Sequence, residues 1–263
     1  MKNILHQLAD SAKQRVAQKK YLHPLEEVKD SALCLKTVDP FRFEKMLQET
    51  SLSFICEVKK ASPSKGILSK DFFPVQIANE YVNAGADAIS VLTEPQFFKG
   101  ANKFLFDIAQ NIKIPTLRKD FIIDEYMLYE SKLLGADAVL LICSLLEKDE
   151  LTQYLSLCDL LNLSAVTETR TKEEIKQAIS SGARIIGVNN RNLTDFTVDI
   201  RQAEILREYV PDTISFIAES GIQTSTDIKR LKQAGVNGVL IGETLMRAKD
   251  KQKKLLELKG EIR

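Results

Sequence analysis

Residues 134–144 read LGADAVLLICS, and this stretch decides the fold because the chain repeats its pattern three more times. The other copies are AGADAISVLTE at residues 84–94, SGARIIGVNNR at 181–191 and AGVNGVLIGE at 234–243. In each copy a glycine typical of a helix end precedes an apolar run typical of a buried strand. The copies recur roughly every fifty residues, which leaves room for one further strand–helix unit between successive copies.

With one further strand–helix unit between successive copies, the chain has eight strands that alternate with helices. The strands are predicted at residues 54–59, 88–92, 116–119, 138–142, 165–168, 185–189, 216–219 and 238–241. Amphipathic helices are predicted at residues 74–84, 103–111, 125–134, 147–161, 172–181, 200–209 and 226–234, and one more from residue 244. Such alternation is typical of parallel sheets. Eight units over about 210 residues favour an α/β fold, a closed (β/α)8 TIM barrel, over an open doubly wound sheet.

The first fifty residues precede this regular part. Residues 2–20 place apolar side chains at helical spacing opposite a face rich in Lys and Arg, and residues 40–49 fit a second helix that Asp39 could cap. No Gly-, Ser- or Pro-rich linker divides the chain. We therefore expect one domain, residues 1–263, with an N-terminal helical extension at 1–50 and the barrel at 51–263.

The composition disfavours several classes of function. Lys and Arg number 37 against 36 Asp and Glu, so no general positive field favours nucleic acid or an anionic membrane. The longest apolar run is too short to span a bilayer, and the first residues lack the apolar segment of a signal peptide. The only histidines are His6 and His23, which disfavours a histidine-based metal site. The four cysteines lack CxxC spacing, which suits reduced thiols and a cytoplasmic location.

Ionisable side chains collect where the predicted strands end. Glu57 and Lys59 are two residues apart at the end of the first strand, so they share a face and can form an ion pair. Lys119 and Glu168 each close an apolar strand with a group that can transfer a proton. The other strand ends carry Glu94, Ser144, Asn189 with Arg191, Glu219 with Ser220, and Gly242 with Glu243. Any one of these could be a helix cap or a surface charge, but the set at one rim of a barrel predicts an active site.

Small residues after the last two strands indicate a phosphate site. Ser220 and Gly221 follow the seventh strand, and Gly242 with Glu243 opens the final helix. Such turns expose backbone N–H groups toward an anion, as in many barrels of this kind. Two tight turns that simply need glycine would have the same sequence.

Taken in order, these motifs resemble the indole-3-glycerol phosphate synthase family. The resemblance is carried by ICEVKKASPSKG at 55–66, SVLTE at 90–94, FFKG at 97–100, LRKDF at 117–121, GVNNRNL at 187–193, AESGI at 218–222 and LIGE at 240–243. It extends from the first predicted helix to the last. The chain has no second module of the size that a fused isomerase needs.

The resemblance implies a reaction and the residues that carry it. The family closes the indole ring of 1-(2-carboxyphenylamino)-1-deoxyribulose 5-phosphate in tryptophan biosynthesis, releasing carbon dioxide and water without metal or cofactor. Lys119 matches the family's general acid, and Glu168 matches the carboxylate of the later proton transfer. Lys59 matches a second acid or an anchor for substrate anions. Glu57 would hold the lysines and contact substrate hydroxyls.

The resemblance also implies the substrate contacts. Asn189 and Arg191 would orient the substrate. The implied phosphate contacts are Ser220, Gly221, Gly242 and Glu243, the last only if its backbone faces the anion. Phe98, Phe121, Leu140 and Leu193 would wall the anthranilate ring, although ordinary core packing is the alternative for these four. Ser62 completes the implied substrate-binding set.

Two other functions stay open at this point. Another phosphate-binding barrel, such as phosphoribosylanthranilate isomerase or a thiazole-phosphate synthase, would share the glycine turns but would not need both lysines and both glutamates together. A non-catalytic sugar-phosphate sensor would bind the substrate and leave it unchanged. We expect a phosphorylated small molecule as the partner, not nucleic acid or membrane, and a monomer or weak homodimer.

Overall fold

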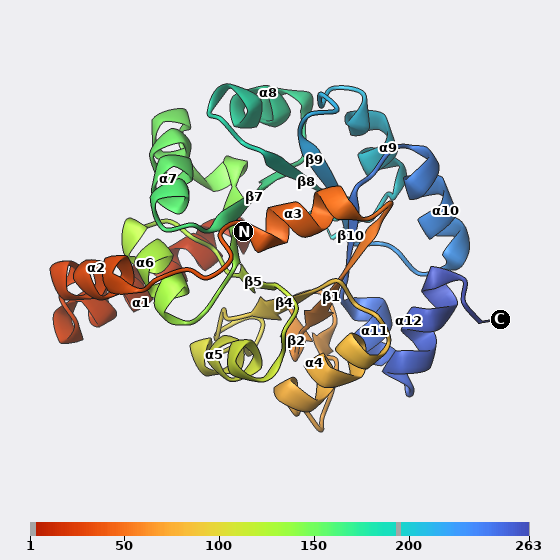
Figure 1. The fold of residues 1–263 in the computed structure, drawn as a ribbon, viewed down its shortest axis with the longest axis horizontal. Helices are drawn as coiled ribbons and strands as arrows, with labels where there is room; N and C mark the ends of the chain where they lie inside the picture. The colour runs from red at the N-terminus through yellow and green to blue at the C-terminus, as the bar shows by residue number, and fades with distance from the viewer. Residues whose placement is uncertain (1–3, 193–195, 263) are drawn as a thin grey trace.

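The computed structural model describes residues 4–192 and 196–262 and contains a closed barrel of eight parallel strands (Figure 1). In order around the barrel these are β1 (Ser53–Val58), β4 (Ala88–Leu92), β5 (Thr116–Lys119), β6 (Ala138–Ile142), β7 (Ser164–Thr169), β8 (Ile185–Asn189), β9 (Ser215–Glu219) and β10 (Gly238–Ile241). The last strand pairs with the first, in a register that sets Ser53 beside Gly238. Every predicted strand is present, and the closed (β/α)8 barrel is confirmed over the open sheet.

Helices surround the barrel (Figure 1). They are α4 (Pro74–Asn83), α5 (Asn102–Asn111), α6 (Glu125–Leu133), α7 (Lys148–Leu160), α8 (Lys172–Ser180), α9 (Arg201–Arg207), α10 (Ser225–Gln233), α11 (Glu243–Arg247) and α12 (Lys251–Lys259). The expectation of one final helix is wrong. The backbone is extended at Ala248, and Asp250 then caps a separate helix by accepting from the backbone N–H of Lys253 at 2.8 Å.

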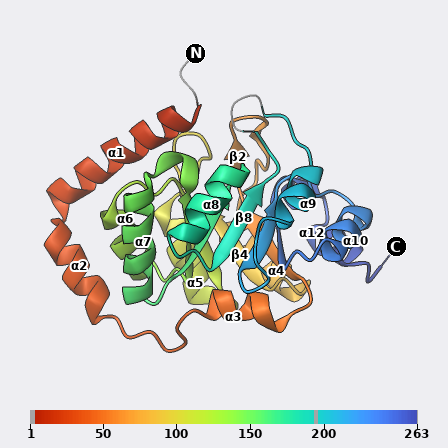
Figure 2. The ribbon, with the colours of Figure 1, turned by 90° about the horizontal axis from the view of Figure 1, so that it is seen from above.

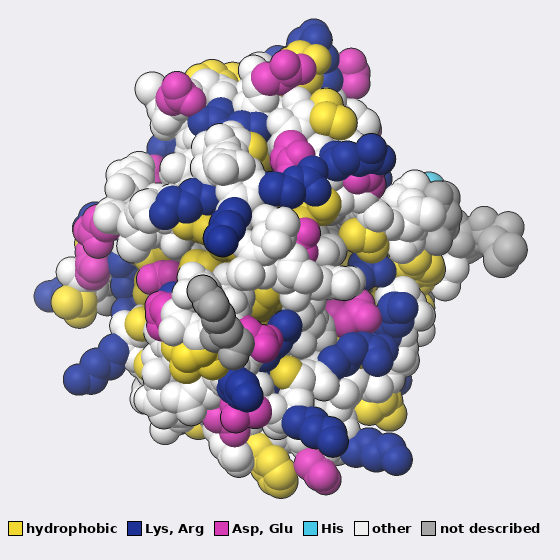
Figure 3. Space-filling view, turned by 90° about the vertical axis from the view of Figure 1, so that its right-hand side faces the viewer, with side chains coloured by type: hydrophobic (Ala, Val, Ile, Leu, Met, Phe, Trp, Pro, Cys, Tyr) yellow, Lys and Arg dark blue, Asp and Glu magenta, His cyan; other side chains and the backbone are white. Residues whose placement is uncertain are grey.

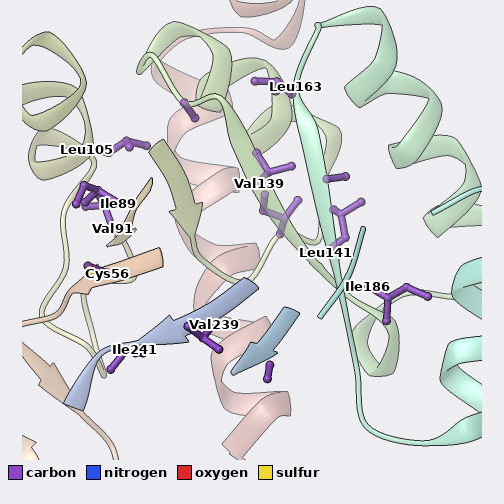
Figure 4. Packing of buried hydrophobic residues seen from close by; sticks show 14 of the residues in the cluster. Cys56, Ile89, Val91, Leu105, Val139, Leu141, Leu163, Ile186, Val239 and Ile241 are labelled. Carbon is purple, nitrogen blue, oxygen red and sulfur yellow. The ribbon is translucent and has the colours of Figure 1, made fainter. Parts of the chain in front are cut away.

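The core has two layers because side chains alternate along each strand. Side chains that point outward pack against the helices, as Cys56, Val91, Val139 and Val239 do in Figure 4. A second cluster contains strand residues that point into the barrel, such as Ile55 and Leu140. This inner layer supports the polar groups at the carboxyl ends of the strands from below.

The N-terminal extension wraps one side of the barrel (Figure 2). Its helices are α1 (Ile4–Leu22), α2 (Leu25–Cys34) and α3 (Arg42–Glu49). Helix α1 begins beside the carboxyl ends of the strands, α2 packs against α6, and α3 covers the amino ends, where Phe43 and Leu47 are fully buried. Helices near α1 and α3 are predicted, whereas α2 is not. The expected cap is wrong, because Asp39 pairs with Lys45 at 2.6 Å and Phe41 occupies the N-cap position.

The surface mixes charges of both signs. On the side that carries α10 and α12, Lys and Arg side chains alternate with Asp and Glu, and hydrophobic side chains are scattered (Figure 3). This pattern agrees with the formal net charge of +1. Among the helices of the described residues, none is both long and apolar enough to cross a membrane.

Candidate active site

A cavity of about 610 Å³ opens at the carboxyl ends of the barrel strands. The catalytic and substrate-contact residues implied by the resemblance all line it within the described ranges, namely Glu57, Lys59, Ser62, Phe98, Lys119, Phe121, Leu140, Glu168, Asn189, Arg191, Ser220, Gly221, Gly242 and Glu243. Of the other residues predicted at this rim, Glu219 lines the cavity, whereas Glu94 and the exposed Ser144 do not. Leu193, the remaining one, lies outside the described residues. Residues almost 190 positions apart in the sequence therefore share one small space, as expected for the catalytic face of a barrel.

Lys119 is the centre of the charged groups in this cavity. It ends β5, and its Nζ lies 3.0 Å from Glu168 Oε2 on β7 and 2.7 Å from Glu219 Oε2 on β9. The three side chains are 12%, 4% and 2% exposed. Asn189 on β8 donates from Nδ2 to the other oxygen of Glu168 at 3.3 Å. The ammonium is thus held between two buried carboxylates, one of which has a second hydrogen bond.

This arrangement shifts the pKa of the lysine and of one carboxylate. Burial by itself lowers the pKa of Lys119, but the charges of Glu168, Glu219 and Glu57 outweigh burial and raise it. Burial raises the pKa of Glu219 to about 7; Lys119 opposes this rise and Glu168 adds to it. Lys119 therefore stays protonated at neutral pH, and Glu219 can gain or lose a proton there.

A second ion pair faces the same cavity from β1. Lys59 Nζ lies 2.5 Å from Glu57 Oε1, and both side chains are largely buried. Gly242, just after β10, leaves room for this pair, since a Cβ there would lie 2.3 Å from Glu57 Oε1 and 2.8 Å from Lys59 Nζ. The predicted pairing of Glu57 with Lys59 on one face is confirmed. Lys59 itself directly follows β1, which ends at Val58.

Arginines surround Glu243 at another wall of the cavity. Glu243 accepts from Arg191 at 3.1 Å and pairs with Arg247 at 3.2 Å, so both carboxylate oxygens have cationic partners. The backbone N–H of Arg191 donates to Asn189 Oδ1 at 3.0 Å, which links this wall to the Glu168 group. The carboxylate of Glu243 is therefore engaged by side chains, and its charge is compensated by neighbouring cations.

Two aromatic rings form an apolar wall. The centroids of Phe98 and Phe121 are 6.0 Å apart. Glu94, fully buried after β4, shapes the loop that presents Phe98, because its carboxylate accepts from the backbone N–H groups of Gln96, Phe97 and Phe98 at 2.7–3.0 Å. Glu94 thus contributes to the site through the backbone of a loop.

The N-terminal helix is anchored next to Lys119. Asp120 is fully buried and accepts from Arg15 of α1 at 2.9 Å, from Thr93 Oγ1 at 2.7 Å and from Arg118 at 3.3 Å. Burial alone raises the pKa of Asp120, but Arg118 and Arg15 overcome it and lower the pKa to about 2. Ile4 and Leu8 of the same helix line the cavity.

Sequence reasoning missed several members of the site. Glu219 was noted at a strand end but not assigned a role, although it lies closer to Lys119 than Glu168 does. Asp120, Ile4 and Leu8 were not selected. A signal for Asp120 existed, since it follows Lys119 directly at a strand end. The contribution of α1 had no such signal, because its apolar residues fit any helix that packs on a core.

No group of three or more His, Cys, Asp or Glu side chains that could hold a metal ion is present among residues 4–192 and 196–262. The polar side chains that line the cavity carry ammonium, guanidinium, carboxylate, amide and hydroxyl groups. Ser62, in a short hairpin formed by β2 (Ala61–Ser62) and β3 (Gly66–Ile67), has a buried Oγ with no hydrogen-bond partner in the described chain. A polar substrate is well matched to such a lining.

A (β/α)8 barrel whose strand ends bring lysines and glutamates together in one cavity has the arrangement of a barrel enzyme that acts on a small molecule, with side chains able to donate and accept protons. The family model described as indole-3-glycerol phosphate synthase matches residues 5–258. The chain belongs to the indole-3-glycerol phosphate synthase family.

Curated relatives agree over nearly the whole chain. The indole-3-glycerol phosphate synthase of Lachnoclostridium phytofermentans is 50% identical over 268 residues, covering 98% of this chain and 99% of that protein. The protein of the same name from Ruminiclostridium cellulolyticum is 51% identical over 257 residues, with the same coverage. These matches decide against the sensor and the other phosphate-binding barrels as the family of this chain.

Solved structures of other enzymes share the fold. A 3-hexulose-6-phosphate synthase superposes with a TM-score of 0.64 at 13% identity, covering 80% of this chain and 100% of that one. Thiamine phosphate pyrophosphorylase from Pyrococcus furiosus superposes with a TM-score of 0.57 at 18% identity, covering 80% and 95%. At these identities the likeness concerns the barrel alone.

Proposed function

We infer that the chain catalyses the indole-3-glycerol phosphate synthase reaction of tryptophan biosynthesis. The substrate is 1-(2-carboxyphenylamino)-1-deoxyribulose 5-phosphate, and the enzyme is a carboxy-lyase that closes the indole ring. The observation that carries this inference is the contact of Lys119 with two buried carboxylates, beside the Glu57–Lys59 pair, in one cavity. The sequence identity of 50% and 51% to two relatives of that name supports the inference.

In the proposed first step Lys119 is the general acid. The ring carbon of the substrate attacks the ketone carbon, a C–C bond forms, and the carbonyl oxygen gains negative charge. The Lys119 ammonium donates a proton to that oxygen. Its raised pKa keeps the proton in place before the attack, and its position between two carboxylates fixes its direction.

In the proposed later steps carbon dioxide and then water leave. The carboxylate carbon leaves as carbon dioxide, and its bonding electrons restore the conjugated ring. Glu168 accepts the proton that must be removed as the hydroxyl departs, and a lysine ammonium protonates that hydroxyl so that it leaves as water. Lys59 is placed to serve as this second acid or to bind a substrate anion, since it faces the cavity beside Glu57.

The proposed binding groups surround these acids and bases. Asn189 and Arg191 orient the substrate, and the backbones of Ser220, Gly221 and Gly242 bind its phosphate. The engagement of the Glu243 carboxylate by two arginines supports the view that only its backbone is offered to the anion. Phe98, Phe121 and Leu140 contact the anthranilate ring, Ser62 contributes its hydroxyl, and Glu219 holds Lys119.

Indole fluorescence tests this function directly. The purified chain is mixed with the substrate, and formation of the indole product is followed over time. We expect multiple turnovers by the wild type and loss of turnover with retained substrate binding for Glu168→Gln. A wild type that binds the substrate and leaves it unchanged would establish the sensor instead. If Glu168→Gln only raises KM, the carboxylate is a binding group.

We also propose the setting of the enzyme. The balanced surface charge and the four free cysteines support a cytoplasmic monomer or weak homodimer that contacts neither nucleic acid nor membrane. The packing of the extension on the barrel supports a single domain, residues 1–263. Light scattering of the purified chain tests the assembly, and a single unfolding transition tests the domain count.

A further inference from the structure

Gly187 of β8 lies next to the carboxylate of Glu219. A Cβ at position 187 would lie 2.6 Å from Glu219 Oε1 and 3.1 Å from Val166 Cγ1. Such a methyl group would therefore meet the far end of a flexible side chain before it met any backbone atom. Gly187 also pairs in register with Glu168, so it sits between the two strands whose carboxylates hold Lys119.

The backbone does not explain why glycine occupies this position. Gly187 is a central residue of a regular strand and is absent from the glycines with positive φ. Any residue can adopt such a conformation, and glycine in a strand interior weakens the strand. Close approach by another group is one established reason for glycine there, besides a bulge or a tight bend. Here that group is a charged side chain of the cavity.

The two oxygens of Glu219 are held differently. Oε2 accepts from Lys119 Nζ at 2.7 Å, whereas Oε1, the atom beside Gly187, has no hydrogen-bond partner among the described residues. A methyl group at 187 would push on the oxygen that is not held. Because a carboxylate moves as a rigid group, that push would also displace Oε2 from the position in which it accepts from Lys119.

We propose that Gly187 is a positioning residue, whose missing side chain gives the Glu219 carboxylate the space from which it holds Lys119. This inference rests on the proposed function for its effect on turnover, but its effect on Glu219 is structural and can be measured separately. Gly187 contacts none of the atoms that react, and it acts only through Glu219.

Gly238 provides a matched control. It also belongs to a barrel strand, and a Cβ there would lie 2.8 Å from Leu47 Cδ2 and 3.5 Å from Ile217 Cγ1. These neighbours are apolar core atoms at the amino ends of the strands. Alanine at 238 should lower the thermal midpoint and leave kcat unchanged, whereas alanine at 187 should lower kcat.

The kinetic experiment compares Gly187→Ala with Gly238→Ala in the indole assay. We expect Gly187→Ala to lose on the order of 10²-fold in kcat, the scale of a misplaced catalytic group. The shorter side chain of Glu219→Asp restores room for the methyl group. Adding Gly187→Ala to Glu219→Asp should therefore cost much less than adding it to the wild type, which a double-mutant cycle measures.

A titration by NMR of Glu219 gives a readout that needs no turnover. The charged groups that face Glu219 are Lys119 on β5, Glu168 on β7 and Glu57 on β1. In Gly187→Ala the Lys119 contact is weakened and the methyl group adds burial, so Glu219 should protonate at a higher pH than in the wild type.

Three results would overturn the inference. One is Gly187→Ala turning over within about twofold of the wild type with an unchanged Glu219 titration, well below the expected misplacement cost. Another is failure of Gly187→Ala to fold. The third is an equal cost of Gly187→Ala in the wild type and in Glu219→Asp. If the wild type itself shows no turnover, the proposed function fails, and the titration still decides the role of Gly187.

Discussion

Lys119 carries a charge inside a barrel at the cost of desolvation, and two carboxylates offset that cost. The cost is not fully offset for Glu219. Burial raises the pKa of Glu219 to about 7, the charge of Glu168 raises it further, and the charge of Lys119 lowers it. Three interacting groups share their protons in such a site. The resulting arrangement keeps an ammonium available as an acid without leaving it isolated in the apolar interior.

Replacing Lys119 by alanine tests the proposed acid. We expect Lys119→Ala to fold and to lose roughly 10²–10⁴ in kcat, the usual contribution of a general acid. This corresponds to about 3–5 kcal/mol of barrier. The exposed Lys103, which pairs with Asp107 on α5, is a matched control that should leave kcat unchanged as alanine. Near-normal turnover by Lys119→Ala in the indole assay would remove it from the mechanism.

Glu219→Gln tests the raised pKa through stability. The folded protein binds a proton at Glu219 up to about pH 7, whereas the unfolded chain releases it near 4.5. Wild-type stability therefore falls as pH rises from 4.5 to 7, and the glutamine variant lacks this loss. Urea unfolding should find the two proteins alike near pH 4 and the variant relatively more stable at pH 8. A difference that shrinks as pH rises would contradict the assignment.

Position at a strand end was enough to predict where charged residues meet, but not what each one does. Glu94 and Glu219 have the same signal, an acid that closes an apolar strand. Glu94 accepts hydrogen bonds from the backbone of its own loop, whereas Glu219 forms an ion pair with Lys119 on another strand. The difference depends on distances between elements that the order of residues does not contain. Asp120 had a signal in its position directly after Lys119, but its contacts with Arg15 and Thr93 are with other elements.

Elements were predicted where a buried apolar run or the strand–helix repeat marks them. The barrel strands are buried along their length and read as short apolar runs with fixed neighbours, so all were found. Helix α2 buries only Val28 and Ala32, and α8 and α10 bury no more; those two were found because the strand–helix repeat marks their places, whereas α2 lies outside the repeat. The break between α11 and α12 was missed because both carry apolar residues at helical spacing.

Ion pairs join helix α1 to one neighbouring unit of the barrel. Arg15 pairs with Asp120, Lys19 with Glu130 and Lys20 with Asp124 at 2.7 Å. All three acids belong to the segment that ends β5 and forms α6. The first of these pairs is the most buried and lies next to Lys119, so it links the extension to the proposed acid.

Arg15→Met should impair catalysis more than a comparable change elsewhere on α1. Removing the guanidinium leaves the buried Asp120 with fewer donors, which costs roughly 1–3 kcal/mol. It also loosens the wall formed by Ile4 and Leu8, so kcat/KM should fall roughly 10- to 100-fold. Lys20→Met, which removes the more exposed pair with Asp124, is the control and should stay near the wild type. Equal effects of the two changes in the indole assay would contradict a specific role for Arg15.

At the scale of the molecule, the extension and the barrel form one packed body. Residues of α1 and α3 belong to the same inner cluster as the strands, with Leu8 at one end and Phe43 at the other. The barrel could be predicted from its repeats, since they fix the number and direction of the strands. The path of the extension around it could not, because it depends on ion pairs between segments about a hundred residues apart.

Acid should weaken the whole molecule partly through Asp120. Its pKa in the folded protein is about 2, below the ordinary 3.8, because Arg118 and Arg15 outweigh burial. The stability that it contributes is complete above 3.8 and is lost as pH falls toward 2. Urea unfolding should show wild type more stable than Asp120→Asn at pH 6, with a gap that narrows below pH 4. A gap that widens in acid would contradict this.

The pairing of β1 with β10 has a consequence for biosynthesis. The barrel cannot close until Gly238, the partner of Ser53, has been synthesised. Helix α1 cannot form its Arg15 ion pair until Asp120 has been synthesised. At about 5–20 residues per second on the ribosome, these delays amount to several seconds or more. Any sheet that forms on the ribosome before the final strand emerges has unpaired edges, so we expect chaperones that cover such edges to matter most at that stage.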